Sequence, residues 1–358
     1  MASPNVYVGM DFGSFKTSIV ASNGRRKTMH TVVGWAKDDV ARAMLGCDVL
    51  VGNHVFEQRL ALNVVRPFEK GNLKYFSASE SGTDLERRKE AARLVVQESV
   101  RHLEIPSGTA KYAVVGAPSR ASVECKKIVT EVLRDFFDGV MIVAEPFAVA
   151  FGMGRLTETL VVDIGAGTTD ICPVFGSYPS EEDQITIPLG GDAIDELFLE
   201  TVKAKYPDVQ ISLNMARQIK EKHGFVHEAN ELAVVSLPVN GRPTQIDVTE
   251  PLRESCKSIV SPIVEGIKEA VRRFDPEFQR PLLNNILLGG GGSCLKGLDR
   301  IIEEALLPYG GGKVCKAYDS VFAGADGALK LAMNVSESHW QQLSAIPSTI
   351  PMRQKVAA

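Results

Sequence analysis

Short apolar runs and helical periodicities alternate along the chain. Apolar runs that end in turn residues, such as the one at 5–11, predict strands. Segments with apolar positions at helical spacing, such as the one at 84–105, predict helices, and the segment 250–274 is expected to form one long helix. Asn-Gly pairs at 23–24 and 240–241 predict the tips of two tight hairpins. This alternation is typical of an α/β protein in which helices cover sheets.

Nearly the same pattern occurs twice in the chain. YVGMDFGSFKTSIVASNG begins at position 7, and LVVDIGAGTTDICPVFG begins at position 160. In each, an apolar run leads to an aspartate, followed by a glycine, a threonine and an isoleucine at the same spacing. The matched positions are Asp11 with Asp163, Gly13 with Gly165, Thr17 with Thr169, and Ile19 with Ile171. Two copies about half a chain apart predict two similar α/β halves.

The repeat gives a domain plan. The first half is predicted at 1–154 with a small insert at about 32–85, and the second at 155–343 with an insert at about 192–265. The proline-dotted segment 344–358 is expected to be a flexible tail. A ligand is expected where the two halves face each other, which is a common place for small-molecule sites.

Both repeated stretches have the residues of an anion-binding turn. Glycine permits tight backbone conformations in which successive N–H groups converge on an anion, and hydroxyl groups add donors. An aspartate at the end of the preceding strand makes sense as a ligand of Mg²⁺, usually through water. We therefore expect a magnesium-bound polyphosphate held from both sides. The anion-binding residues would be Gly13, Ser14, Phe15, Lys16, Thr17, Gly165, Ala166, Gly167, Thr168 and Thr169, and the metal-facing residues Asp11 and Asp163.

The alternative for each stretch is a plain strand–turn–strand with a glycine for geometry. A matched second copy makes that alternative the weaker one. Neither stretch contains GxxxxGK[ST] or GxGxxG, which disfavours Ras-like switches and dehydrogenases.

Three further segments are candidates. The loop LLGGGGSCLKG at 287–297 has four consecutive glycines, which would let a flat ring pack on bare backbone, although a flexible turn is the alternative. Glu145 is expected at a strand end just before a helix, where it could orient or deprotonate an attacking water or simply favour the helix dipole. Lys220 and Glu221, late on a predicted helix, indicate a solvated charged face on the residues alone.

Composition narrows the class of protein. The 358 residues carry a formal net charge of −4, which argues against a broad nucleic-acid surface. The six cysteines form no CxxC pair or His/Cys cluster, so a structural zinc site is not expected. Most of them lie in apolar runs and are expected to be buried, which suits a reducing cytoplasm. No run of 18 or more apolar residues predicts a membrane span.

The motifs together resemble the actin superfamily. Asp11–Thr17, Glu145–Pro146, Asp163–Asp170, LGGDAIDE at 189–196, RQIKEKHG at 217–224 and LGGGGSCLKG at 288–297 occur in the order found there, and the resemblance covers residues 5–335. The stretch EPFAVAFG at 145–152 and the length resemble bacterial actins of the MreB type. Shorter stretches, such as VVDIGAGTTDIC and HWQQL, are similar to the magnetosome-associated branch of those actins.

The resemblance implies a fold and a set of roles. The fold would be the actin-like ATPase fold, two ribonuclease-H-like α/β halves around a central nucleotide cleft. Glu145 would position the water for hydrolysis, and Thr168 would sit beside the terminal phosphate, with Asp163 completing the catalytic set. Gly190 and Gly191 would line the cleft, and Lys220 and Glu221 would contact ribose and adenine. Gly290, Gly291 and Gly292 would flank adenine and the α-phosphate.

The resemblance also implies an activity. Members bind ATP or ADP with Mg²⁺, assemble head to tail into paired protofilaments and hydrolyse ATP in the polymer. Filaments of the magnetosome branch organise magnetosome chains in the cytoplasm, which implies magnetosome-associated proteins as partners. The alternatives are a cell-shape or plasmid-segregation actin, a monomeric switch or chaperone-type ATPase, and a small-molecule kinase, because the fold alone does not choose among them.

The sequence departs from the bacterial-actin pattern at two positions. Lys16 stands where a polar uncharged residue is usual, and Phe15 where a small one is usual. Lys16 either adds a phosphate contact or points away from it. We find no clear counterpart of the membrane-inserting segments that MreB relatives carry, which puts direct bilayer binding in doubt.

Overall fold

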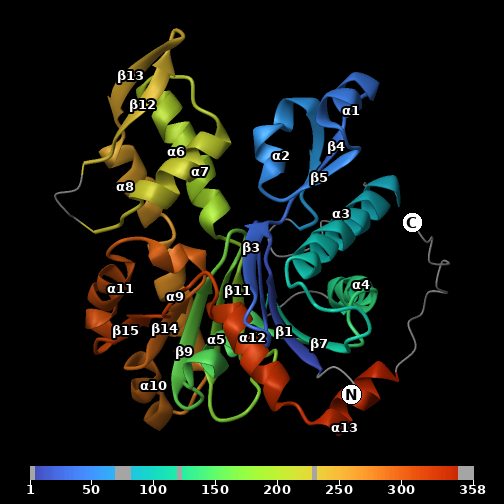
Figure 1. The fold of residues 1–358 in the computed structure, drawn as a ribbon. Coiled ribbons are helices and arrows are strands. Elements are labelled where there is room, and N and C mark those ends of the chain that lie inside the picture. Colours follow the sequence, from blue (N-terminus) through green and yellow to red (C-terminus); the bar gives the residue numbers. More distant parts are fainter. Residues whose placement is uncertain (1–4, 69–81, 119–122, 228–231, 346–358) are drawn as a thin grey trace. The chain divides into compact units, whose positions relative to one another are not determined.

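The computed structural model describes residues 5–68, 82–118, 123–227 and 232–345 (Figure 1). The chain forms two units. Unit 1 comprises residues up to 117, residues 121–143 and the chain from 325 onward, and unit 2 comprises 118–120 and 144–324. The last two helices therefore belong to unit 1, whereas the domain plan from the sequence assigned them to the second half. Of the predicted tail, Ser344 ends a helix, and 346–358 lie outside the described residues.

Each unit is built on a five-stranded sheet with the same strand order. In unit 1 the order is β3-β2-β1-β7-β8, and in unit 2 it is β11-β10-β9-β14-β15. The central strand of each sheet, β1 or β9, pairs antiparallel with the next strand in sequence and parallel with a later one. The duplicated α/β fold predicted from the repeat is confirmed. The strands are β1 (Val6–Phe12), β2 (Lys16–Ala21), β3 (Arg26–His30), β7 (Lys111–Ala117), β8 (Gly139–Ala144), β9 (Thr159–Ile164), β10 (Thr169–Val174), β11 (Ile185–Ile187), β14 (Ile286–Gly289) and β15 (Val314–Lys316).

The two repeated stretches form hairpins with the same register. In unit 1 Phe12 pairs with Thr17, and in unit 2 Ile164 pairs with Thr169. Each hairpin therefore encloses four residues between the last paired positions, and each aspartate lies one step back along its strand. Asp11 is opposite Ser18, and Asp163 is opposite Asp170.

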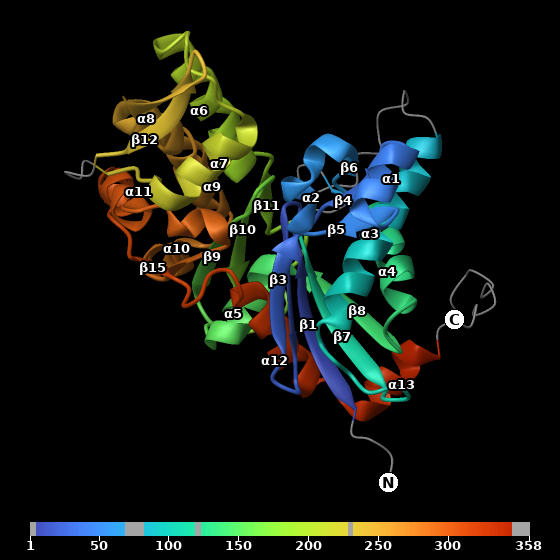
Figure 2. The same cartoon turned by 45° about the horizontal axis from the view of Figure 1, so that its top comes forward.

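Alternation along β1 explains how helices cover both faces of the unit 1 sheet. Val8, Met10 and Phe12 point into a core formed with α3 (Gly82–Arg101) and α4 (Val123–Arg134), which Figures 1 and 2 show on one side of this sheet. Gly9 faces α12 (Ala323–Asn334) instead. A Cβ on Gly9 would lie 2.0 Å from the Ala325 carbonyl oxygen, so only glycine allows this close approach.

The same alternation places Asp163 in unit 2. Leu160, Val162 and Ile164 of β9 belong to a core that also contains residues of α6 (Gly191–Lys205), α9 (Val260–Arg272) and α11 (Leu298–Leu306). Because successive strand residues point to opposite faces, Asp163 lies on the other face, where α5 (Glu145–Met153) packs on β9.

Each sheet is accompanied by an insert. The insert in unit 1 is a three-stranded sheet in the order β5-β4-β6 with short helices, namely β4 (Val33–Ala36), α1 (Asp39–Leu45), β5 (Val49–Val51), α2 (His54–Glu57), η1 (Arg59–Ala61) and β6 (Leu62–Val65). The insert in unit 2 contains α6, α7 (Leu213–His223), β12 (Val234–Val239), β13 (Arg242–Asp247) and α8 (Thr249–Lys257). Val239 pairs with Arg242, so Asn240 and Gly241, both with positive φ, form the predicted two-residue turn.

The segment 250–274 is two helices, so the prediction of one long helix is wrong. Helix α8 ends at Lys257, and α9 begins at Val260. Pro262 is the cause, because it lacks an N–H and its ring would clash with the carbonyl four residues earlier, at Ser258. The second helix restarts so that the proline lies in its first turn, where no intrahelical donor is needed. The remaining helical segments are α10 (Pro276–Leu283), η2 (Gly291–Cys294), η3 (Leu307–Tyr309) and α13 (Glu337–Ser344).

Helix α13 is anchored to unit 1 by a buried tryptophan. Trp340 is fully buried, stacks on Tyr112 with ring centroids 5.2 Å apart, and donates its Nε1–H to the Ala332 carbonyl at 3.2 Å. We expect Trp340→Ala to destabilise the protein by about 3–5 kcal/mol, because it leaves a cavity and an unpaired carbonyl. Thermal denaturation of this variant, beside the exposed neighbour variant His339→Ala, checks the prediction. A melting temperature within a degree of the wild type would contradict it.

Candidate functional site

The second hairpin is closed by its own backbone and by the strand beside it. The Gly165 N–H donates to the Thr168 carbonyl at 2.9 Å. The Thr168 hydroxyl donates to Asp170 Oδ2 at 3.2 Å, and Asp170 Oδ1 accepts from the Thr186 hydroxyl at 2.5 Å. Asp170 therefore fixes the side chain of Thr168, which the sequence analysis assigned beside a terminal phosphate. Its own role was not recognised there, although it closes the GTTD motif.

The start of helix α6 packs directly on this hairpin. The first amides of the helix, on Gly191 and Asp192, donate to the Gly165 and Ala166 carbonyls at 3.0 and 2.8 Å. A Cβ on Gly190 would lie 2.6 Å from the Gly165 oxygen, so glycine is required at this junction. The structure thus brings four predicted site residues together. It also shows that these two helix amides bind protein carbonyls, so they are not donors for an anion.

Asp163 is the most perturbed acid of this region. Its side chain is buried, and its Oδ1 has no hydrogen-bond partner among the described residues. Burial raises the pKa of Asp163 well above its ordinary value, and the nearby carboxylates of Glu145 and Asp170 raise that pKa further. A buried carboxylate in this setting must hold its proton or meet a cation.

The glycines at 289–292 serve mainly to make room for β9. A Cβ on Gly289 or Gly290 would lie 2.7 Å from Asp163 Oδ1, and one on Gly292 would lie 2.2 Å from Ile164. Only Gly291 of the four has open space around such an atom among the described residues. Packing against Asp163 and Ile164 therefore accounts for three of the four glycines, and Gly291 is the position open to a ligand.

The Asp163 carboxylate is suited to a divalent cation that keeps its water ligands. Its buried Oδ1 is unsatisfied, and the carboxylates of Glu145 and Asp170 are close enough to raise the pKa of Asp163. Within the described ranges no group of three or more His, Cys, Asp or Glu side chains could hold a metal directly. Mg²⁺ is commonly held by one or two carboxylates together with water and phosphate oxygens, so a direct cage is not needed.

Lys220 lies close to the hairpin through a buried ion-pair network. Its Nζ is 2.7 Å from Asp195 Oδ1 and donates to the Gly191 carbonyl at 2.7 Å. Arg217, one helical turn earlier, pairs with Asp195 at 2.9 Å and with Asp192 at 3.0 Å. The expectation of a solvated charged face is wrong for Lys220, whose side chain is 12% exposed, although Glu221 is exposed; Arg217 beside Lys220 is 9% exposed. The available signal was that two acids, Asp192 and Asp195, have the same three-residue spacing as the two cations, Arg217 and Lys220.

The first hairpin, in unit 1, is fastened from the side by Arg66. Arg66 Nη2 donates to the Ser14 carbonyl at 3.0 Å, and its guanidinium carbon lies 5.1 Å from the centre of the Phe15 ring. The Phe15 ring is buried and packs edge-on to His30. The side chain of Phe15 is therefore an anchor of the hairpin, and its main chain is the part that could meet a ligand. Arg66 was not recognised from the sequence.

The other predicted residues of this hairpin divide into internal and exposed ones. A Cβ on Gly13 would lie 2.7 Å from the Lys16 carbonyl, which explains the glycine. The Thr17 hydroxyl is buried and shares a 2.8 Å hydrogen bond with Thr31. Its counterpart Thr169 is also buried and donates to a backbone carbonyl at 2.8 Å. Lys16 is exposed at the start of β2.

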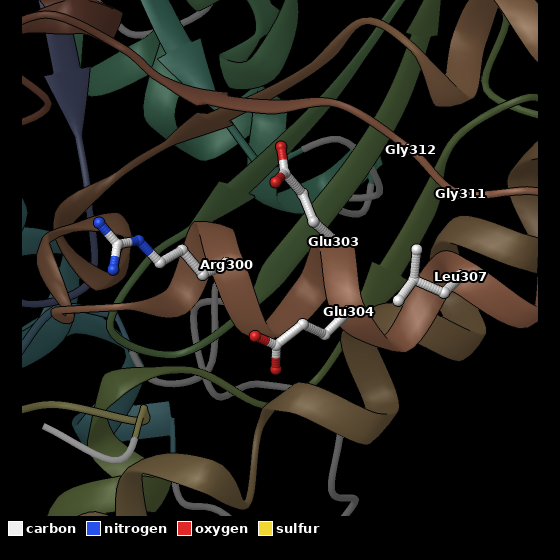
Figure 3. Close-up of a pocket in the computed structure, with 6 residues that line it drawn as sticks. All are labelled: Arg300, Glu303, Glu304, Leu307, Gly311 and Gly312. Atoms are coloured by element: carbon white, nitrogen blue, oxygen red, sulfur yellow. The ribbon is translucent and has the colours of Figure 1, made fainter.

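A pocket of about 290 Å³ lies elsewhere in unit 2, beside α11 (Figure 3). Figure 3 shows its charged side chains leaving the helix in different directions rather than converging. Glu303 accepts from the Val314 N–H at 2.8 Å, and Glu304 pairs with His227 at 3.1 Å. Its lining includes no predicted site residue, and the geometry suggests no chemistry. The lining residues are Arg300, Glu303, Glu304, Leu307, Gly311 and Gly312.

The structure also tests the predictions about cysteine burial and membrane-spanning helices. Cys125, Cys172 and Cys256 are buried, whereas Cys294 is exposed, and all six cysteines are free. Three of the six are therefore buried, fewer than the majority that the sequence predicted. No helix in the described ranges is long and apolar enough to cross a membrane.

The duplicated α/β fold with paired glycine hairpins defines an actin-like protein. The chain belongs to the MreB/Mbl protein family, whose model matches residues 8–338. It is 34% identical to the actin-like protein MamK of Paramagnetospirillum magneticum over 345 residues, which cover 96% of this chain and 97% of that protein. It is 33% identical to MamK of Magnetospirillum gryphiswaldense, covering 96% and 94%. The similarity to the magnetosome branch predicted from short stretches is confirmed.

Solved structures agree with the sequence comparison. The MamK double helical filament matches with a TM-score of 0.87 at 34% identity, covering 93% of this chain and all of that one. A non-polymerising MamK mutant bound to AMPPNP matches with a TM-score of 0.70.

Sequence similarity to the cell-shape branch of the family covers less of the chain. The cell shape-determining protein MreB of Escherichia coli is 28% identical over 205 residues, 50% of this chain and 58% of that protein.

Proposed function

We propose that this protein is an ATP-dependent, filament-forming actin that binds Mg-ATP, polymerises and hydrolyses ATP in the filament. The observation that carries the proposal is Asp163, a buried carboxylate with an unsatisfied oxygen at the foot of a glycine hairpin. Similarity to MamK over nearly the whole of both chains supports it, since MamK is known as a filament and in an AMPPNP-bound form.

Each group of residues has a proposed task. Main-chain amides of the hairpins at 13–17 and 165–169 bind the phosphates, except that of Gly165, which donates to the Thr168 carbonyl, and Asp11 and Asp163 hold Mg²⁺ through water. The cation, when bound, neutralises charge that develops on the phosphate oxygens. Gly291, which has open space beside it, is proposed to contact the base, and Glu221, exposed on α7, to contact the ribose and adenine.

Glu145 is the proposed water-orienting residue. It begins α5, and it is close enough to Asp163 to raise the pKa of that carboxyl. A carboxylate beside the metal-facing aspartate can accept a hydrogen bond from the attacking water and hold its oxygen toward the terminal phosphate. The Thr168 hydroxyl, fixed by Asp170, would face the same phosphate.

Assembly and hydrolysis are tested together. Light scattering and phosphate release are followed on the purified protein after addition of ATP and Mg²⁺, and filaments are sought by negative-stain microscopy. We expect scattering to rise above a critical concentration, with phosphate release lagging behind it. Turnover without assembly would favour a monomeric switch on the same fold, and absence of both would overturn the proposal.

We further propose that the filament lies in the cytoplasm and organises magnetosome chains together with magnetosome-associated proteins. The MamK relatives match 96% of this chain, whereas MreB of Escherichia coli matches 50%, which favours this role over cell-shape control. Expression of the chain in a magnetotactic cell that lacks its own MamK tests the role. Chains that stay scattered although filaments form would contradict it.

The junction between Gly190 and the hairpin gives a prediction for binding. Gly190→Ala is expected to lower the affinity for Mg-AMPPNP by about tenfold or more, because the new Cβ would displace the Gly165 and Ala166 carbonyls. Nucleotide titration at a protein concentration below assembly measures this. Glu200→Ala, exposed on the same helix, is the matched control. Equal affinities for the two variants would count against the hairpin as the phosphate site.

A further inference from the structure

Four charged side chains form an alternating chain between the first turn of α6 and helix α7. Asp192 pairs with Arg217, Arg217 with Asp195, and Asp195 with Lys220, at distances of 3.0, 2.9 and 2.7 Å. Lys220 then donates to the Gly191 carbonyl at 2.7 Å. The two acids and two bases sum to zero charge, so the network neutralises itself.

The network is buried and therefore costly to form. The Asp195 side chain is 0% exposed, and burial raises its pKa even though Lys220 and Arg217 oppose that effect. Apolar side chains of similar volume could often stabilise such a site equally well. A network in which acids and cations alternate also fixes the geometry between the elements that it joins. Here it joins α6 to α7.

Two hydrogen bonds connect the start of α6 to the hairpin at 165–169, which is the proposed phosphate hairpin. The Gly191 and Asp192 amides, in the same helical turn as Asp195, donate to the Gly165 and Ala166 carbonyls. A shift of that turn must therefore move or release the tip of the hairpin. The exposed pair of Lys205 with Glu250, at the other end of α6, has no such connection.

We propose that Asp195 is a positioning residue that, with Arg217 and Lys220, holds the first turn of α6 and thereby sets the geometry of the phosphate hairpin. Lys220 takes part through its contacts with Asp195 and the Gly191 carbonyl. The link from network to hairpin stands on the structure alone, and only its consequence for nucleotide rests on the proposed function.

The link is tested by hydrogen exchange on the nucleotide-free protein. Asp195→Asn keeps the volume and removes the charge, and we expect about tenfold faster exchange at the Gly165, Gly191 and Asp192 amides. Glu250→Gln, which removes the exposed pair, should leave these amides unchanged. If Asp195→Asn does not fold, Lys220→Met gives the same readout with the Arg217 pairs intact. Exchange no faster than in Glu250→Gln overturns the proposal.

A double variant separates positioning from stability. Asp195→Asn with Lys220→Met leaves Asp192 paired with Arg217, so the network stays neutral and neither remaining charge loses its partner. We expect Asp195→Asn alone to lower both the melting temperature and the affinity for Mg-AMPPNP, the latter about tenfold, and the double variant to recover the melting temperature toward the wild type without recovering the affinity. Recovery of both would mean that the network only stabilises the fold. A wild type that binds no AMPPNP would overturn the proposed function and leave the exchange result standing.

Discussion

Asp163→Asn is expected to lower magnesium-dependent ATP turnover by about 100-fold or more. Asp163 Oδ1 is buried without a partner among the described residues, and the substitution removes the charge that would hold the hydrated cation. Phosphate release measured across a magnesium titration checks this. An unchanged magnesium dependence would show that Asp163 does not face the metal.

In the nucleotide-free protein, Asp163→Asn is expected to raise the stability at neutral pH. A loss of ATP turnover in this variant could therefore not be explained by misfolding. Burial raises the pKa of Asp163 in the folded state above its unfolded value. Stability from the protonated carboxyl is therefore fully present below the unfolded pKa and is lost as pH rises toward the folded pKa. At neutral pH Asp163→Asn escapes this loss.

Melting temperatures measured at several pH values test the pKa argument. The wild type should lose stability relative to Asp163→Asn as pH rises above the ordinary range of a carboxyl pKa, in the absence of magnesium and nucleotide. Addition of Mg-AMPPNP should then stabilise the wild type more than the variant. Parallel pH profiles for the two proteins would contradict the raised pKa.

Glu145→Gln is expected to slow ATP hydrolysis by about 100-fold or more while leaving Mg-AMPPNP affinity and ATP-driven assembly close to wild type. The substitution keeps the shape of the side chain at the start of α5 and removes its capacity to accept a proton from water. Filaments of the variant should persist longer after ATP addition, because they retain the triphosphate.

Light scattering and phosphate release measured on the same sample separate an effect on assembly from an effect on ATP hydrolysis. Glu158→Gln, which lies in the same unit on the segment between α5 and β9, is a matched control of the same chemistry. Normal phosphate release from Glu145→Gln would remove Glu145 from the mechanism. Loss of assembly together with hydrolysis would assign it to binding instead.

The sequence predicted those features that depend on neighbours along the chain. The alternation of apolar and polar positions, the matched hairpins around Asp11 and Asp163, and the Asn240–Gly241 turn all follow from local backbone geometry and strand periodicity. The break between α8 and α9 was also local in origin, since Pro262 marks it, but the long apolar periodicity concealed it.

The sequence located the motifs of the site, but it did not predict which groups their side chains contact. Gly289, Gly290 and Gly292 suggested a bare surface for a ring, and the structure adds a packing reason for these glycines, because Asp163 and Ile164 fill the space that a Cβ would need. Which atoms occupy that space depends on the packing of β14 against β9, which no local pattern encodes. Phe15 and Thr17 similarly have buried side chains, with partners in β3 (His30) and just after it (Thr31).

The sequence by itself determined the duplicated α/β plan and the positions of both hairpins, because these arise from periodicities and turn residues that act over a few positions. Tertiary structure decided that Arg217 is buried and Lys220 partly buried beside Asp195, that Arg66 fastens the first hairpin, and that α13 belongs to unit 1. A charged side chain can be buried only where a partner from a distant element neutralises it, and that pairing exists only after the elements pack.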